Sequence, residues 1–160
     1  MMSRTMATRA GVIQPEEGYD DWGPKRHYRR MIWRTFSDLL KGQTASSRSL
    51  LLPSLGGAEI DVALCNGFRQ TNMIVVDKNP AVAAHLRRKF PHLFRCYGDW
   101  LWKVSPRVVK DVTVGWGERD SIVDVANLDL CNVIAAPLMR EVHTFVSFVE
   151  PRFVAVTILR

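Results

Sequence analysis

Hydrophobic and polar residues form blocks along this chain, and their spacing changes between the period of a helix and that of a strand. The first block is "KRHYRRMIWRTFSDLLKG", from Lys25 to Gly42. Its apolar residues recur at helical spacing at Tyr28, Ile32, Phe36 and Leu39 or Leu40. Its arginines fall mostly elsewhere around the helix, and Gly42 is a suitable end. The pattern predicts a basic amphipathic helix.

Beyond a polar connector, apolar runs of strand length alternate with helical patterns. The runs predict strands at 49–54, 73–77, 93–99, 121–130 and 152–159, and helices at 58–68, 80–90 and 136–149. Asn79 is a suitable N-cap for the second of these helices, and Pro80 suits its first position. The segment 109–121 could be a strand, a hairpin arm or a loop, and the glycines on either side of Trp116 favour a turn.

Strands that alternate with helices indicate right-handed crossovers and a parallel sheet covered on both faces. The sequence therefore predicts an α/β fold with an open, mostly parallel, Rossmann-like sheet. Residues 25–160 would form this single domain, and residues 1–24 an irregular N-terminal arm.

Composition limits the classes of function. The chain has 160 residues and no apolar stretch near the roughly 20 residues of a membrane span. Its N-terminus has no secretory pattern, so we expect a cytoplasmic protein that is not bound to a membrane. Three widely spaced cysteines in apolar segments, Cys65, Cys96 and Cys131, predict reduced core thiols, with neither a disulfide framework nor a metal site.

The net charge of +6 permits binding to a polyanion such as nucleic acid. The candidate residues for such binding lie on the first predicted helix: Lys25, Arg26, Arg29, Arg30 and Arg34. The alternative is that they form an ordinary solvated outer face of that helix.

Polar or glycine residues lie at the ends of the first four predicted strands. In open α/β sheets, ligands bind beyond the carboxyl ends of the strands, which here are 53–57, 77–79, 98–100 and 127–132. Gly56 and Gly57 would let a ligand approach backbone N–H groups. Asp77 follows Gly57 by 20 residues, a spacing at which an acid meets ribose hydroxyls. The alternative for Asp77 is a cap of the following helix.

The end of the third strand offers groups that could recognise a base. Asp99 could accept a hydrogen bond from the amine of adenine, and Trp100 could stack on the ring. Alternatively, Gly98 and Asp99 form a common turn, and Trp100 and Trp102 are core or interface aromatics.

The order of these features over residues 49–160 resembles the class I S-adenosylmethionine-dependent methyltransferases, most closely in "VVDKNPAVAAHL". "NLD" after the fourth strand more loosely resembles small phage-type and archaeal methyltransferase-like proteins. The resemblance implies S-adenosylmethionine as cofactor. It implies a cofactor site made of Pro53, Gly56, Gly57, Glu59, Asp77, Lys78, Asn79, Asp99 and Trp100. Asn127 and Asp129 would orient the methyl acceptor.

The chain departs from that family in three places. "PSLGGAE" replaces the usual GxGxG loop, although Glu59 could partly replace the acid of the first strand. "NLDL" stands where amino-methylating DNA enzymes have [DNS]PP[YF]. The sequence given ends soon after the fifth strand, so the sheet would have an edge that a partner protein, a second copy or the N-terminal arm covers.

Three hypotheses follow. The first is a methyltransferase with a nucleic acid or related acceptor. The second is a catalytically inactive methyltransferase-like module that assembles through its sheet edge. The third, a nicotinamide-binding protein, ranks last because GxGxxG is absent. No GxSxG, P-loop or HExxH pattern supports a hydrolase, NTPase or zinc protease.

Overall fold

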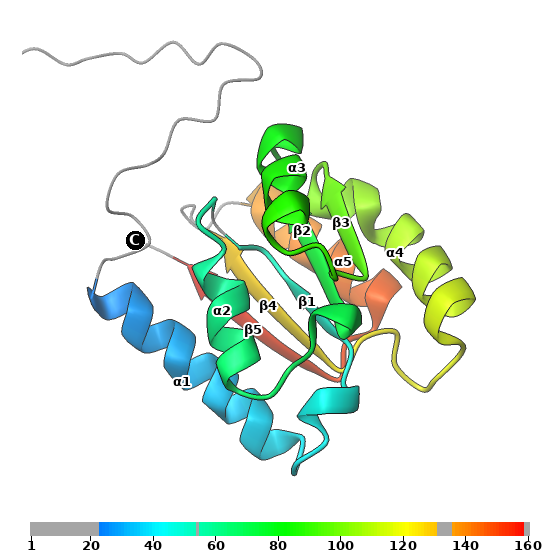
Figure 1. Cartoon of the computed structure of the whole chain (residues 1–160). Coiled ribbons are helices and arrows are strands. Elements are labelled where there is room, and N and C mark those ends of the chain that lie inside the picture. Colours follow the sequence, from blue (N-terminus) through cyan, green and yellow to red (C-terminus); the bar gives the residue numbers. More distant parts are fainter. Residues whose placement is uncertain (1–22, 54, 131–135, 159–160) are drawn as a thin grey trace, which may run out of the picture.

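The protein is an open, five-stranded, all-parallel α/β structure (Figure 1). The computed structural model describes residues 23–53, 55–130 and 136–158. Its strands are β1 (Ser49–Leu51), β2 (Met73–Asp77), β3 (Arg95–Gly98), β4 (Val125–Leu130) and β5 (Phe153–Ile158). Its α-helices are α1 (Gly23–Leu39), α2 (Ala58–Cys65), α3 (Pro80–Lys89), α4 (Leu101–Trp116) and α5 (Ala136–Val149). Short 3₁₀ turns lie at Thr44–Ser46 and Gln70–Asn72.

The sheet has the strand order β3-β2-β1-β4-β5, with β1 in the middle. Leu50 of β1 pairs with Ile74 of β2 on one side and with Ala126 of β4 on the other. The strand order therefore reverses between β1 and β4, the position where open α/β sheets form a ligand crevice. The predicted α/β class and parallel sheet are confirmed.

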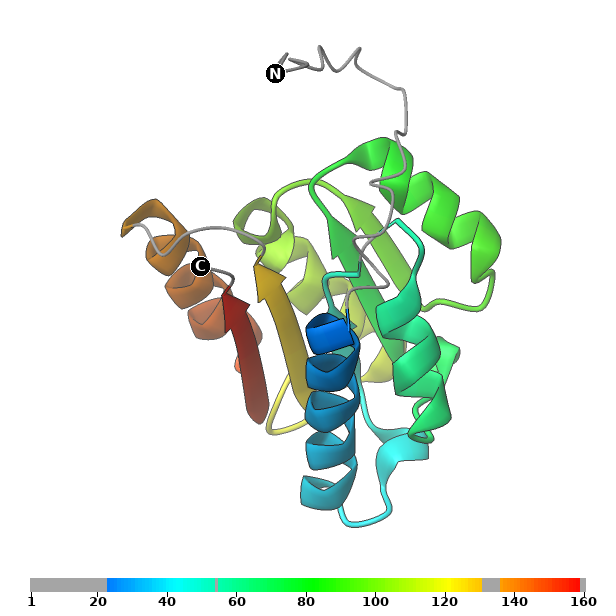
Figure 2. The same cartoon turned by 90° about the vertical axis from the view of Figure 1, so that its left-hand side faces the viewer.

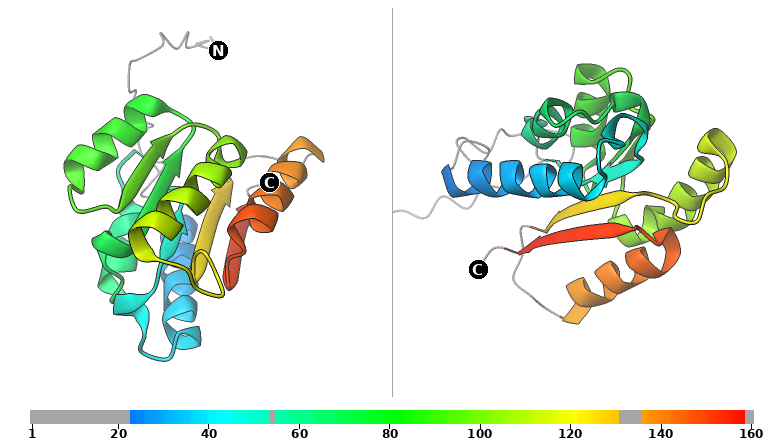
Figure 3. Two further views of the ribbon diagram at one scale, coloured as in Figure 1. Left: turned by 90° about the vertical axis from the view of Figure 1, so that its right-hand side faces the viewer. Right: turned by 90° about the horizontal axis from the view of Figure 1, so that it is seen from below.

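Helices cover both faces of the sheet and enclose two apolar cores. Helices α1, α2 and α3 lie on one face (Figure 2), and α4 and α5 lie on the other (Figure 3). Neighbouring residues of β1 point to opposite cores, because side chains alternate along a strand: Leu51 faces α1–α3 and Leu50 faces α4 and α5.

Helix α1 is rotated relative to the sequence prediction. Phe36 and Leu40 are buried as predicted, but Tyr28 is 52% exposed, so the prediction that it faces the core is wrong. The buried face is a stripe of residues three or four apart: Lys25, Arg29, Trp33, Phe36 and Leu40. The helix therefore presents a polar half and an apolar half to the rest of the molecule.

Helix α4 includes most of the segment 109–121, for which the sequence predicts a strand, a hairpin arm or a loop with a turn at its glycines. That prediction is wrong. Residues 101–116 form one helix that includes Pro106, and Gly117, with φ of +78°, follows its end. Pro106 lacks the N–H that would bond within the helix, and valines and threonine have modest helix propensity. Burial of Val104, Val108 and Val112 at helical spacing outweighs both costs.

Strand β5 forms one edge of the sheet, since no other described strand pairs with its outer side. Two of its valines, Val154 and Val156, are partly exposed. In the described residues, no helix combines the length and apolar character needed to cross a membrane. The predicted N-terminal arm lies almost entirely outside the described residues, as do the predicted strand-end residues Cys131 and Asn132.

Candidate functional site

The carboxyl ends of β2 and β3 bring the first group of predicted site residues together. Asp77 pairs with Gly98 in the parallel register, so the residues after both strands emerge side by side (Figure 1). Lys78 reaches the next strand end, where its Nζ lies 5.6 Å from the centroid of the Trp100 ring. This arrangement places an acid, a cation and an aromatic ring at one end of the sheet.

Asp77 has one carboxylate oxygen available to a ligand. Its Oδ1 accepts a hydrogen bond of 2.7 Å from the backbone N–H of Asn79, whose own Oδ1 accepts one of 2.9 Å from Ala81 N–H. Asn79 is therefore the N-cap of α3, and Asp77 supports the turn before it. Its Oδ2 makes no hydrogen bond within the described part of the chain. Burial raises the pKa of the Asp77 carboxyl above its ordinary value, although the Asn79 N–H and Lys78 oppose this.

Asp99 fits the expected adenine contact less well than Trp100 does. Its Oδ1 accepts a hydrogen bond of 2.8 Å from Trp100 N–H, and its carboxylate lies within 3.9 Å of Lys103 and 3.6 Å of Arg107. Its oxygens are thus shared with groups of its own chain. Trp100 is 43% exposed, so its ring can accept a planar ligand.

The loop between β1 and α2 shows why glycine stands at position 57. Gly57 has φ of +70°, which disfavours other residues, and a Cβ there would lie 2.5 Å from Cε2 of Phe90. This glycine is explained by packing against α3. Pro53 before it is buried, while Gly56 is exposed and its carbonyl accepts a hydrogen bond from Lys89 Nζ.

Substitution can separate the two reasons for glycine at position 57, its left-handed backbone and its close contact with Phe90. Gly57→Ala is expected to cost about 1–2 kcal/mol for its left-handed backbone and about 1 kcal/mol or more for the contact with Phe90. Gly42→Ala is the matched control, because Gly42 has φ of +84° but nothing within 4 Å of its Cβ position. Urea unfolding should show the larger loss at Gly57, and equal losses would exclude the packing role.

A second group of predicted site residues lies under α1. The Glu59 carboxylate of α2 is 1% exposed and accepts hydrogen bonds from Arg29 Nε at 3.0 Å and from Trp33 Nε1. Asn127 of β4 donates its side-chain N–H to the same carboxylate. Glu59 therefore joins α1, α2 and β4, and it does not face a ligand.

The end of β4 is held by α1 as well. Lys25 Nζ lies 2.9 Å from Asp129 Oδ2, and the two side chains are only 5% and 9% exposed. Desolvated ions of opposite charge in contact fix the helix over the strand. Asn127 and Asp129, which would orient a methyl acceptor, are thus covered by α1 in this structure.

Burial sets the electrostatics of this second group. It raises the pKa of the Glu59 carboxyl, against the opposing effects of the Trp33 N–H, the Arg29 charge and the Asn127 N–H. Oδ1 of Asn127 is buried and has no hydrogen-bond partner among the described residues. Within that part of the chain, a buried polar atom is thus left uncompensated at the crevice between β1 and β4.

The predicted basic surface of α1 is divided by this packing. Lys25 and Arg29 are buried against acids and do not belong to a solvated basic face. The other three predicted nucleic-acid residues, Arg26, Arg30 and Arg34, are exposed. One feature of the sequence does separate the buried basic residues from the exposed ones. Lys25 and Arg29 precede the apolar Trp33 by eight and four positions, so they lie on the same side of the helix as this core residue.

The described cysteines, and the described side chains of the types that bind metals, add no further candidate chemistry. Burial raises the pKa of the Cys96 thiol to about 11, so it stays protonated at neutral pH. Cys65 is exposed and unbridged, which corrects its predicted position in the core. No three His, Cys, Asp or Glu side chains of the described residues are grouped to hold a metal ion.

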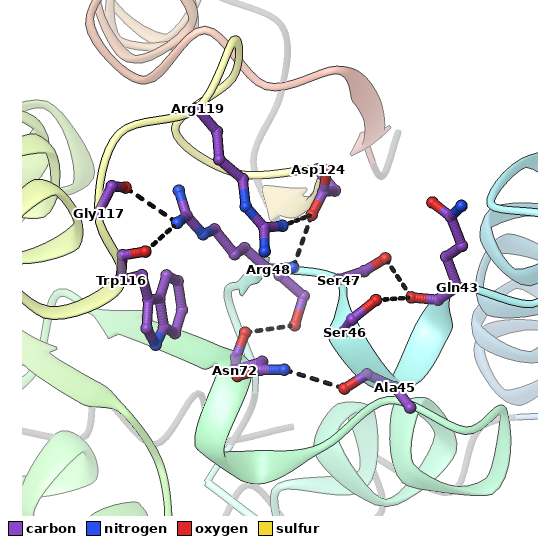
Figure 4. A network of polar contacts seen from close by, with 11 residues as sticks. Gln43, Ala45, Ser46, Ser47, Arg48, Asn72, Trp116, Gly117, Arg119 and Asp124 are labelled. Carbon is purple, nitrogen blue, oxygen red and sulfur yellow. Dashed lines mark hydrogen bonds and ion pairs between the residues drawn. The ribbon is translucent and has the colours of Figure 1, made fainter.

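Sequence reasoning missed a polar network at the opposite, amino end of the sheet (Figure 4). The buried Arg48, just before β1, donates from Nη2 to the carbonyls of Trp116 at 2.6 Å and Gly117 at 2.9 Å. Its backbone N–H bonds to Asp124 Oδ2 at 2.8 Å. Arg48 thus ties β1 to the end of α4. Its neighbours in sequence form only a polar connector, so no pattern predicted this role.

The fold is that of the open parallel α/β proteins with a Rossmann-like sheet. Comparison with protein-family models, curated proteins and solved structures found no match to this chain.

The geometry of the strand ends fits one part of the expected cofactor. Asp77 Oδ2 can accept from a ribose hydroxyl, and the exposed Trp100 ring can stack on a base. Asn127 and Asp129 are expected to orient the methyl acceptor. Asn127 instead donates a hydrogen bond to Glu59, and Asp129 forms an ion pair with Lys25 of α1. The residues expected to contact a nucleoside are thus accessible at the strand ends, whereas those expected to orient an acceptor are covered by α1.

Proposed function

We propose that this chain is a methyltransferase-like protein that binds S-adenosylmethionine at the carboxyl ends of β2 and β3 and methylates a nucleic acid. The observation that carries the proposal is Asp77, whose Oδ2 has no partner within the described chain and which lies beside the strand end bearing Trp100. Asp77 would accept from the ribose, and Trp100 would stack on adenine.

The chain's own residues would bind and position the ligand. When bound, the cofactor supplies a sulfonium-activated methyl group that passes to the acceptor in an in-line displacement. Catalysis then depends on orientation, and on a base where the acceptor must lose a proton. Asp129 is the candidate for orienting the acceptor, and this role requires the Lys25–Asp129 contact to open.

The proposal is tested by titration calorimetry of the chain with S-adenosylmethionine, S-adenosylhomocysteine and NAD. Asp77→Asn keeps an acceptor for the Asn79 N–H but removes the negative charge. We expect this variant to weaken S-adenosylhomocysteine binding at least about tenfold, the effect of losing a charge-assisted hydrogen bond. Asp38→Asn, at an exposed acid of α1, should bind as the unchanged protein does.

The pH dependence of binding supplies a second readout of Asp77. Because a ribose contact needs the ionised carboxylate, binding should weaken as the pH falls through the raised pKa of Asp77. The loss should begin above the pH expected for an ordinary aspartate, about 3.9. Asp77→Asn should remove this dependence. The absence of binding, or binding unaffected by Asp77→Asn, would contradict the proposal.

A specific observation favours a second candidate, a methyltransferase-like interaction module without turnover. Asn127 and Asp129 are covered by α1, and Val154 and Val156 at the β5 edge are partly exposed. Such a module would use the β5 edge for assembly with a second copy or another protein. It predicts cofactor binding without methyl transfer to nucleic acid, whereas the first candidate predicts both.

A further inference from the structure

Two partly exposed tryptophans stand at the start of α4. Trp100 is the N-cap residue of the helix and Trp102 lies in its first turn, and the two are 43% and 42% exposed. By contrast, Trp33 is fully buried in the core. Rings as large as tryptophan are highly buried on average, so two exposed rings so close in sequence form an unusual surface.

Each of these rings has a lysine beside it. The Nζ of Lys78 lies 5.6 Å from the ring centroid of Trp100, and the Nζ of Lys103 lies 5.4 Å from that of Trp102. An ammonium group over an aromatic ring is attracted by the ring's quadrupole. Each of the two exposed rings at the start of α4 therefore has a cation in contact with it.

The outer side of α4 continues the positive charge. Lys103, Arg107 and Lys110 are exposed and follow one another at intervals of four and three residues, so they share one side of the helix. At 1.5 Å per residue they span about 10 Å of helix axis. This length is similar to that of three stacked nucleotides at about 3.4 Å each.

Nearby acids neutralise only part of this charge. We define the α4 surface as Lys78, Trp100, Trp102, Lys103, Arg107 and Lys110. This surface has four positive charges. Asp99, which lies near Lys103 and Arg107, offsets one of them, so three remain. Asp111 is bonded to Arg95, and these two charges cancel.

We infer that the α4 surface binds single-stranded nucleic acid, with a base stacked on Trp102 and phosphates along Lys103, Arg107 and Lys110, while Trp100 at the edge of this surface is left to the cofactor's adenine. Positive grooves combined with exposed aromatic rings are typical of proteins that bind single strands, because every base has a face that can stack. A duplex hides those faces. The net charge of +6 favours a polyanion in general.

This inference deepens the proposed function, since it places the acceptor next to Asp77, but it is measured without a cofactor. The two proposals can therefore fail separately: loss of oligonucleotide binding leaves the calorimetric test of Asp77 unaffected, and the reverse also holds. It also moves the predicted nucleic-acid surface from α1 to α4.

The test is the fluorescence anisotropy of labelled twelve-nucleotide thymidine and uridine strands, titrated with the full chain at several salt concentrations. Trp102→Ala should weaken binding about tenfold, because one stacked aromatic ring contributes strongly to single-strand affinity. Trp102→Phe keeps a ring and should retain most of the affinity. Circular dichroism of both variants checks that they are folded.

The basic side of α4 is tested by Lys103→Gln/Arg107→Gln/Lys110→Gln. Each phosphate contact on a single strand contributes about 0.7 to the slope of log affinity against log salt, so the slope should fall by about 2. The matched control is Arg30→Gln/Arg34→Gln/Arg88→Gln, which removes three exposed cations from other helices. This control should change neither affinity nor slope appreciably.

Four results would overturn the inference. They are no binding of either strand at low salt, equal binding of a duplex, an equal loss in the Arg30, Arg34 and Arg88 control, and equal competition by a polyglutamate peptide. The last would show that the surface recognises negative charge alone, as a site for an acidic protein would.

Discussion

Replacing Glu59 with leucine is expected to lower the free energy of unfolding by about 3–5 kcal/mol, the cost of breaking a buried ion pair by removing one partner. The substitution leaves the Arg29 guanidinium, 3% exposed, without its carboxylate. It also removes the acceptor of the Trp33 and Asn127 N–H groups. Each buried donor left without a partner adds to the cost.

Two further variants show whether the pairing causes that loss. Glu59→Leu/Arg29→Met removes both charges and should recover a large part of the stability, because paired apolar replacements often substitute for buried ions. Asp61→Leu changes an exposed acid of the same helix and should stay within about 0.5 kcal/mol of the unchanged protein. Urea unfolding measures all three variants. A loss below about 1 kcal/mol for Glu59→Leu would contradict the packing of α1 described above.

Replacing Arg48 with methionine is expected to cost about 2–3 kcal/mol. The variant keeps an apolar stem but loses both bonds to the carbonyls of Trp116 and Gly117 at the end of α4 (Figure 4). Hydrogen bonds to a charged group contribute about 1.5–3 kcal/mol each, and a cation also favours a helix C-terminus.

Part of that cost is offset in the variant. Nη1 of Arg48 is buried and makes no hydrogen bond to the described residues, and burial together with Arg119 lowers the pKa of the guanidinium. Removing the side chain removes both penalties. Arg119→Met is the control. Arg119 is half exposed, and its ion pair with Asp124, at 3.9 Å, is long and therefore weak. Equal small losses in thermal unfolding of the two variants would show that Arg48 does not tie β1 to α4.

Local patterns were sufficient for the elements whose signals agree with their packing. β2 at 73–77 and α5 at 136–149 have the predicted bounds, because a β-branched run and a long apolar period leave little ambiguity. Asn79 was also identified as an N-cap, which its bond to Ala81 N–H confirms. These features depend on residues within one element.

Features that depend on distant residues could not be predicted in this way. The sequence predicts Lys25 and Arg29 as exposed residues that bind nucleic acid or face solvent, because no local pattern shows that Asp129 and Glu59 lie opposite them. The two acids are separated from these basic residues by 104 and 30 positions. Only the folded sheet brings them together, and for the same reason the candidate site divides into two groups.

The measurement that most directly tests the central claim, a nucleoside site at the ends of β2 and β3, is a nitrogen–proton correlation spectrum of this 18.2 kDa chain titrated with S-adenosylhomocysteine. We expect saturable shifts of the backbone amides of Asp77 to Asn79 and Gly98 to Trp100. We expect only small changes near Arg119 and Ser121 at the opposite end of the sheet. Unchanged amides at the strand ends, or shifts confined to the opposite end, would contradict this claim.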